Sequence, residues 1–143
     1  MADGLRRAIA GSSGPFYAVG LARAAKLLDG KSAAMGGDWL AGFTAAIDAV
    51  EELGGARTGD RTMIDALRPA AEAWAAALER DVPPIEAFSA AVSAAQSGAE
   101  ATAQMFPSLG RASYLGDRAK GIPDGGARAV AIWLHAIEEA LRT

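Results

Sequence analysis

A chain of 143 residues, about half of them apolar, is long enough to form one domain with a hydrophobic core. Its net charge of -3 argues against a protein that binds nucleic acids or anionic membranes. The absence of cysteine excludes disulfides and thiolate metal ligands, and a single histidine, His135, excludes a histidine-rich zinc site within one chain.

The N-terminal stretch contains a basic pair, Arg6-Arg7, but no apolar core of signal-peptide length. No apolar run approaches the roughly 18 residues that a helix needs to span a bilayer. These features predict a cytoplasmic protein that does not enter the membrane.

Apolar residues recur at helical spacing in every long segment, and no segment alternates with the period of two that is typical of strands. Alanine, about a quarter of the residues, also favours closely packed helices. Helices are expected at about 2–10, 15–30, 37–53, 61–80, 83–107 and 125–142, the fourth of them bent at Pro69. The sequence therefore predicts one all-α domain over residues 1–143, an antiparallel bundle or barrel of about six helices.

Three of the expected helix starts carry serine or aspartate beside glycine. They are Ser12-Ser13-Gly14-Pro15, Gly59-Asp60-Arg61-Thr62 and Asp124-Gly125-Gly126. Serine and aspartate are ordinary N-caps, but the glycines let a ligand approach the backbone, and free N–H groups at a helix start attract phosphate. Any one start is most simply a capped helix. When the three starts are considered together with the polar segment 110–118, an anion site where helix ends converge is an equally good interpretation.

Three other candidates do not predict a site. Residues 54–62, GGARTGDRT, are similar to a phosphate-binding P-loop, but Asp60 stands where the lysine belongs and a helix precedes the loop. His135 lies within the last helix without an evident partner, which is more typical of a packed or surface residue than of a catalyst. The acidic pair Glu138-Glu139 is typical of a solvated helix face.

Three stretches make the sequence similar to a known family. They are GSSGPFYAVGLARAA, GGARTGDRTMIDALRPA and GRASYLGDRAKGIPDGGA. In order and spacing they resemble the L subunit of bacterial dihydroxyacetone kinases, a domain that also occurs fused in single-chain dihydroxyacetone kinases. The resemblance covers essentially the whole chain. It implies a barrel of antiparallel helices that binds ADP or ATP at one end.

The resemblance also implies a nucleotide-binding role for eight residues. They are Ser12, Ser13, Gly54, Met63, Arg111, Asp124, Gly125 and Gly126. The serines would hold phosphates, Gly54 and Met63 would border the base, and Asp60 and Thr62 would shape the loop between them. Segment 110–118 would be a lid over the nucleotide that is closed by Arg111 and hinged by two glycines, Gly110 and Gly116. The Asp124 motif ends the site, although the family usually has proline where Gly125 stands.

One part of the family pattern is missing. The family carries, well before its first serine motif, a loop of closely spaced aspartates that binds a pair of magnesium ions, whereas Asp3 is the only carboxylate among the eleven residues before Ser12. We therefore expect an incomplete barrel with no metal ligands and no catalytic residues of its own, inactive in isolation. A C-terminal piece of a longer protein, a split gene whose partner supplies the loop, and a homologue that lost catalysis all remain open.

The leading functional hypothesis is a nucleotide-binding subunit that presents phosphate to dihydroxyacetone held by a separate K subunit. The nucleotide would be exchanged as ATP, or retained as ADP and rephosphorylated by a phosphotransferase-system protein. The alternative is a non-enzymatic regulatory or interaction module whose exposed apolar groove binds a second copy or a partner helix. An unrelated alanine-rich bundle is the third hypothesis.

Overall fold

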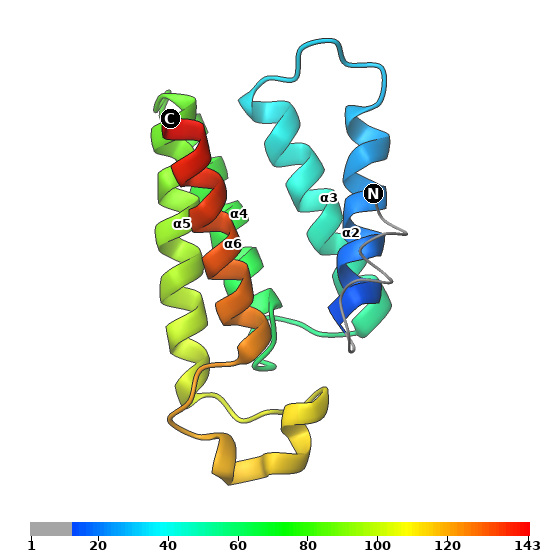
Figure 1. Cartoon of the computed structure of the whole chain (residues 1–143), viewed down its shortest axis with the longest axis vertical. Coiled ribbons are helices and arrows are strands. Elements are labelled where there is room, and N and C mark those ends of the chain that lie inside the picture. The colour runs from blue at the N-terminus through cyan, green and yellow to red at the C-terminus, as the bar shows by residue number, and fades with distance from the viewer. Residues whose placement is uncertain (1–12) are drawn as a thin grey trace. The chain divides into compact units, whose positions relative to one another are not determined.

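The computed structural model describes residues 13–143, with Arg111 described by its backbone alone (Figure 1). The expected helix at 2–10 and the candidate residue Ser12 lie outside the described residues. The helices are α2 (Ser13–Leu28), α3 (Gly36–Gly54), α4 (Ile64–Glu79), α5 (Pro84–Ala101), the short 3-10 helix η1 (Thr102–Gln104), the 3-10 segment η2 (Arg111–Ala119) and α6 (Gly125–Arg142). Residues 13–143 contain no strand, which confirms the all-α prediction. None of their helices is both long and apolar enough to cross a lipid bilayer.

The chain divides into two compact units, one ending at Gly55 and the other comprising residues 56–143, and each is described by itself. The N-terminal unit is an antiparallel hairpin of α2 and α3 (Figure 1). Gly20 lets the two helices approach closely, because a Cβ atom there would lie 3.3 Å from the Ala46 carbonyl oxygen. An ion pair of 2.9 Å between Arg23 and Glu52 joins their exposed faces, where it contributes little stability.

The C-terminal unit packs α4, α5 and α6 side by side (Figure 1). Its large buried side chains come from the apolar positions that recur at helical spacing in the sequence. They include Ile64, Leu67, Trp74, Phe88, Val92, Val130 and Leu134. The rings of Trp74 and Phe88 meet edge to face with their centroids 5.0 Å apart, so an aromatic pair joins α4 to α5.

Helices α4 and α5 approach each other closely at Gly98. A Cβ atom at Gly98 would lie only 2.1 Å from the carbonyl oxygen of Asp65 and 3.3 Å from the Cα atom of Ala66. That carbonyl cannot take the usual helical hydrogen bond from residue 69, because Pro69 has no N–H group. Helix α4 continues through Pro69. The Asp65 carbonyl, which has no helical donor, faces the backbone of α5 at Gly98.

Two expected helix boundaries were wrong. Helix α4 begins at Ile64 instead of about residue 61, because residues 56–63 form an irregular loop in which Arg61 has a φ of 60°. Helix α5 ends at Ala101 instead of Pro107 and continues as the single turn η1. The expected polar insert at 110–118 is a 3-10 segment that is interrupted at Gly116.

We predict that Gly98→Ala lowers the free energy of unfolding by about 1–3 kcal/mol, because the added methyl group overlaps a backbone carbonyl that cannot rotate away. The matched control is Gly37→Ala in α3, where a Cβ atom would meet nothing within 4 Å. This control should leave stability unchanged or raise it by up to about 1 kcal/mol. Urea unfolding followed by circular dichroism measures both variants. Equal stabilities would contradict the close approach of α4 and α5.

Candidate functional site

The loop before α4 is organised by two aspartates. The Asp65 carboxylate, only 2% exposed, accepts hydrogen bonds from the backbone N–H groups of Gly59 at 2.5 Å and Thr62 at 2.8 Å. The Asp60 carboxylate accepts a bond of 2.8 Å from the N–H of Arg57. A buried carboxylate is stable only when donors replace the water that it loses, so these bonds fix the path of residues 57–62.

Arg61, between the two aspartates, is 4% exposed and donates every hydrogen bond of its side chain to backbone carbonyls. Its Nε donates to the Thr102 oxygen at 3.2 Å. One terminal nitrogen donates to the oxygens of Ala119 at 2.9 Å and Ile122 at 2.7 Å. These carbonyls lie just after α5, at the end of η2 and just before α6. A single side chain therefore joins three segments of the C-terminal unit to the loop before α4.

Thr102 links the same region to the start of α6. Its buried hydroxyl donates to the carbonyl oxygen of Ala99 and accepts a bond of 2.7 Å from the backbone N–H of Asp124. Asp124 is the N-cap of α6, and its carboxylate accepts from the N–H of Ala127 at 2.9 Å. The end of α5 therefore sets the position of the first turn of α6.

The first turn of α6 presents backbone donors beside Met63. Within the described part of the chain, no acceptor bonds the N–H groups of Gly125 and Gly126. A Cβ atom at Gly126 would lie 3.5 Å from the Cβ atom of Met63 and 3.0 Å from an Asp124 carboxylate oxygen. Four of the residues expected from the sequence, Met63, Asp124, Gly125 and Gly126, therefore lie together at one end of the C-terminal unit.

The segment between α5 and α6 forms a loop whose two ends are joined. The N–H of Gly121 donates to the carbonyl of Ala103 at 2.8 Å, and between these residues lies η2, the proposed lid (Figure 1). The hydroxyl of Ser108 donates to the Asp60 carboxylate at 2.9 Å, which ties the lid to the loop before α4. Two donors, the N–H of Arg57 and then the hydroxyl of Ser108, hold the pKa of Asp60 below its ordinary value.

The lid itself is exposed, with 86% of Tyr114 accessible to solvent. Gly110 and Gly116, the expected hinges, have φ angles of 68° and 51°, in the region that favours glycine. The backbone of Arg111 follows Gly110 directly. A small hollow of about 90 Å³ lies between the lid and the end of α5. Its lining residues are Gln104, Met105, Phe106, Pro107, Gly116, Asp117 and Lys120.

The other two described candidates, Ser13 and Gly54, belong to the N-terminal unit. Ser13 is the first residue of α2 and Gly54 the last residue of α3, so both lie at the same end of this antiparallel hairpin. A Cβ atom at Gly54 would lie 2.8 Å from the Phe16 ring. Packing against Phe16 is therefore one reason for glycine at position 54, beside the expected approach of a base.

Magnesium does not fit the described residues. They contain no group of three or more histidine, cysteine, aspartate or glutamate residues that could hold a metal ion. The three aspartates nearest the proposed site, Asp60, Asp65 and Asp124, each accept backbone N–H groups instead. Their carboxylates shape the loops.

Sequence analysis missed Arg61, Asp65 and Thr102. Arg61 stood inside the GDRT motif, but nothing in the pattern separates a buried arginine from an exposed one. Asp65 occupies the first turn of α4, where an acidic residue ordinarily interacts with the helix dipole at the surface. The usable signal was a pair of opposite charges four residues apart at the start of a helix, Arg61 and Asp65.

Comparison with known proteins identifies the family. The chain matches the DAK2 domain over residues 1–139 and belongs to the DAK2-domain family. It is 38% identical over 139 residues to a putative 3,4-dihydroxy-2-butanone kinase of Solanum lycopersicum, covering 95% of this chain and 23% of that protein. It is 37% identical over 133 residues to the triokinase/FMN cyclase of Homo sapiens, covering 93% and 23%.

An L-erythrulose kinase of Pectobacterium atrosepticum is 33% identical over 133 residues, covering 93% of this chain and 22% of that protein. The crystal structure of the dihydroxyacetone kinase of C. freundii superposes with a TM-score of 0.70 at 27% identity, covering 97% of this chain and 22% of that one. The chain therefore spans less than a quarter of the length of these relatives. All of them are named as kinases, which favours a phosphotransferase family over the interaction module.

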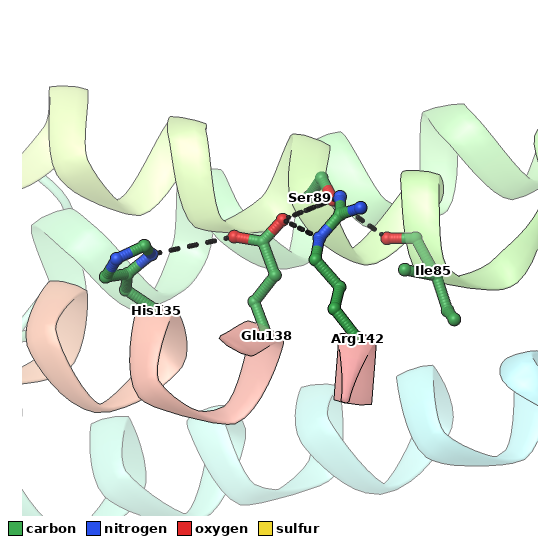
Figure 2. A network of polar contacts seen from close by, with 5 residues as sticks. All are labelled: Ile85, Ser89, His135, Glu138 and Arg142. Atoms are coloured by element: carbon green, nitrogen blue, oxygen red, sulfur yellow. Dashed lines mark hydrogen bonds and ion pairs between the residues drawn. The ribbon is translucent and has the colours of Figure 1, made fainter. Parts of the chain in front are cut away.

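A second polar cluster lies on α5 and α6, away from their ends at the lid (Figure 2). Arg142 donates to the Ser89 hydroxyl at 2.6 Å and to the Glu138 carboxylate at 3.1 Å, and Ser89 itself contacts Glu138. His135, about half exposed, lies 3.7 Å from Glu138. The interpretation of Glu138 as a solvated residue was therefore wrong, whereas His135 is a surface residue as expected.

We predict that the stability of Glu138→Gln depends less on pH in the acidic range than the stability of the wild-type protein does. Bonds from Ser89 and then Arg142, which outweigh the effect of burial, lower the pKa of Glu138 below its ordinary value of 4.5. A carboxylate with a lowered pKa stabilises the fold above its unfolded-state pKa, and this contribution is lost as the pH falls through the folded-state pKa. The variant should melt earlier than wild type near neutral pH and lose less stability below about pH 4.5.

Thermal melts across this pH range measure the effect, with Glu139→Gln as the control. Glu139 is exposed, and its side chain forms no hydrogen bond or ion pair with the described residues. The control should follow the wild-type curve. A Glu138→Gln curve parallel to wild type at all pH values would show that the cluster contributes no pH-dependent stability.

Proposed function

We propose that this DAK2 domain binds ADP or ATP at the end of its helices and presents the terminal phosphate for transfer to a small ketose. The observation that carries the proposal is the first turn of α6, where the N–H groups of Gly125 and Gly126 have no acceptor among the described residues. Such a helix start concentrates partial positive charge and backbone donors. Phosphate oxygens are the acceptors that fit it best.

Met63 supplies the apolar side of the proposed site. It lies directly beside Gly126, which brings a soft, adaptable side chain next to the backbone donors. A nucleotide needs this combination, because its phosphates require donors and its base requires an apolar surface.

Segment 110–118 would close over the bound nucleotide. Hydrogen bonds at Gly121 and Ser108 hold its ends, while its middle is exposed and contains two glycines at positive φ. A segment whose ends are held and whose middle can change its backbone conformation is suited to closing over a bound ligand. Arg111, directly after Gly110, would contribute a guanidinium to a phosphate or ribose oxygen.

The domain would act by positioning and by electrostatics, while a separate K subunit or domain holds the ketose. Dihydroxyacetone is the proposed substrate, in line with the name of the C. freundii kinase. The nucleotide would be exchanged as ATP, or kept as ADP and rephosphorylated in place by a phosphotransferase-system protein. Cytoplasmic metabolism is the setting that these partners imply, and a homodimer is compatible with them.

We predict that Arg111→Ala weakens ADP binding by about 10- to 150-fold without unfolding the protein. A charge-assisted hydrogen bond from guanidinium to an anionic oxygen contributes roughly 1.5–3 kcal/mol, and about 1.4 kcal/mol corresponds to each factor of ten. Arg111→Lys should recover part of the affinity, because the charge remains and the planar fork is lost. Calorimetric titration with ADP and magnesium provides the measurement.

The control for this titration is Arg118→Ala, which removes an exposed arginine from the same segment. It should bind ADP as wild type does. If wild-type binding is measurable and Arg111→Ala binds ADP with the same affinity, segment 110–118 is only a connection between helices and not a lid closed by Arg111. No saturable heat from the wild-type chain would contradict the nucleotide site itself.

We also predict that residues 1–143 do not phosphorylate dihydroxyacetone, even with a K-type partner, ATP and magnesium. Phosphoryl transfer brings several negative charges together, and magnesium ordinarily offsets them, but the described residues offer no set of metal ligands. An aspartate-rich metal loop, supplied in cis or as a second chain, should restore turnover. Rapid turnover by residues 1–143 without it would contradict this prediction.

A further inference from the structure

We propose that Arg61 is a positioning residue: its buried guanidinium holds the base of the lid and the first turn of α6 in the geometry that receives the nucleotide phosphate. The inference rests on the proposed function. It concerns a residue that contacts neither the lid's exposed middle nor the free N–H groups of α6, and that acts through the backbone segments it joins.

The carbonyls that Arg61 contacts lie at both ends of the lid loop. Nε donates to Thr102, before the loop, and a terminal nitrogen donates to Ala119 and Ile122, after it. The bond from Gly121 to Ala103 lies between these contacts. Removing the guanidinium would leave two bonds to close a loop of more than fifteen residues, from the N–H of Gly121 to Ala103 and from the N–H of Asp124 to the Thr102 hydroxyl. Arg61 therefore limits how far the base of the lid can open.

The same guanidinium also acts on the start of α6. Ile122, one of its acceptors, is two residues before the N-cap Asp124. Thr102, another acceptor, receives the N–H of Asp124 on its hydroxyl while its carbonyl receives Arg61. The bond from Arg61 to Ile122 and the bond from the Asp124 N–H to Thr102 together hold the backbone at Asp124 in place. Because Asp124 caps Ala127, the orientation of the donors at Gly125 and Gly126 follows from Arg61.

The chemistry of the site requires arginine instead of lysine. The three carbonyls approach two nitrogens of a planar group, Nε and one terminal nitrogen, and a single ammonium cannot donate from the same positions. Arg61 also has a φ of 60°, a conformation that costs a non-glycine residue energy. No ion pair within the described residues neutralises the guanidinium, so its positive charge remains at the base of an anion site.

The test compares Arg61→Lys and Arg61→Met with a control that weakens the same unit elsewhere. Val92→Ala serves as the control, because Val92 is buried in α5 and contacts none of the carbonyls. Amide hydrogen exchange is measured at a temperature at which every variant is folded. Both Arg61 variants should accelerate exchange at Gly121, Asp124 and Ala127 by about tenfold or more relative to Val92→Ala.

A second measurement separates positioning from general stability. In ADP titrations with magnesium, Arg61→Lys should bind about tenfold or more weakly than Val92→Ala at similar melting temperature. Thr102→Val, which removes the hydroxyl that accepts Asp124 and keeps the side-chain shape, should weaken binding in the same direction. In Thr102→Val, the rate of amide hydrogen exchange should rise at Asp124 and Ala127 but not at Gly121.

Exchange that rises evenly over the C-terminal unit in the Arg61 variants would overturn the inference. ADP affinities of these variants that match Val92→Ala would overturn it as well. If the wild-type chain binds no ADP, the proposed function fails by itself. In that case the exchange pattern alone decides whether Arg61 sets the geometry of the lid base and of α6.

Discussion

The guanidinium of Arg61 lies where backbone segments from three parts of the C-terminal unit meet the loop before α4. Burying an ionised group costs several kcal/mol unless hydrogen bonds replace its hydration, so the carbonyls around Arg61 have to remain in place when the protein folds. Asp65 imposes the complementary constraint, because its buried carboxylate requires the N–H groups of Gly59 and Thr62. Two buried charges thus determine a loop that has no regular structure.

The helices provide the support on which these loops depend. The backbone carbonyl of Asp65 faces Gly98 of α5. The residue whose carboxylate organises the loop therefore also lies at a close contact between α4 and α5. Thr102 continues from the same α5 and joins the cap of α6. The proposed phosphate donors at the start of α6 are therefore held in place by the bond from the Asp124 N–H to the Thr102 hydroxyl, while the lid, residues 110–118, has an exposed middle. This division is typical of sites that bind a ligand and then close over it.

The fold could be predicted from the sequence because it depends on local periodicity: apolar residues such as Val92 and Val130 recur at helical spacing and are buried as expected. Part of the site could be predicted too, since Asp124 and its glycines are visible as a capped helix start. Arg61 and Thr102 could not, because their roles depend on carbonyls distant in sequence and on a left-handed backbone conformation. Glu138 was misjudged for a similar reason, since its partner Ser89 lies on another helix.

The central claim is that phosphate binds to the first turn of α6. Backbone amide resonances recorded while the folded chain is titrated with ADP and magnesium test it most directly, because an anion that accepts these bonds changes the shielding of the donors. We expect saturable shifts at Gly125 and Gly126, with the same concentration dependence as shifts at Met63 and Arg111. Saturable shifts confined to other helices, or no shift at Gly125 and Gly126 at saturating ADP, would contradict it.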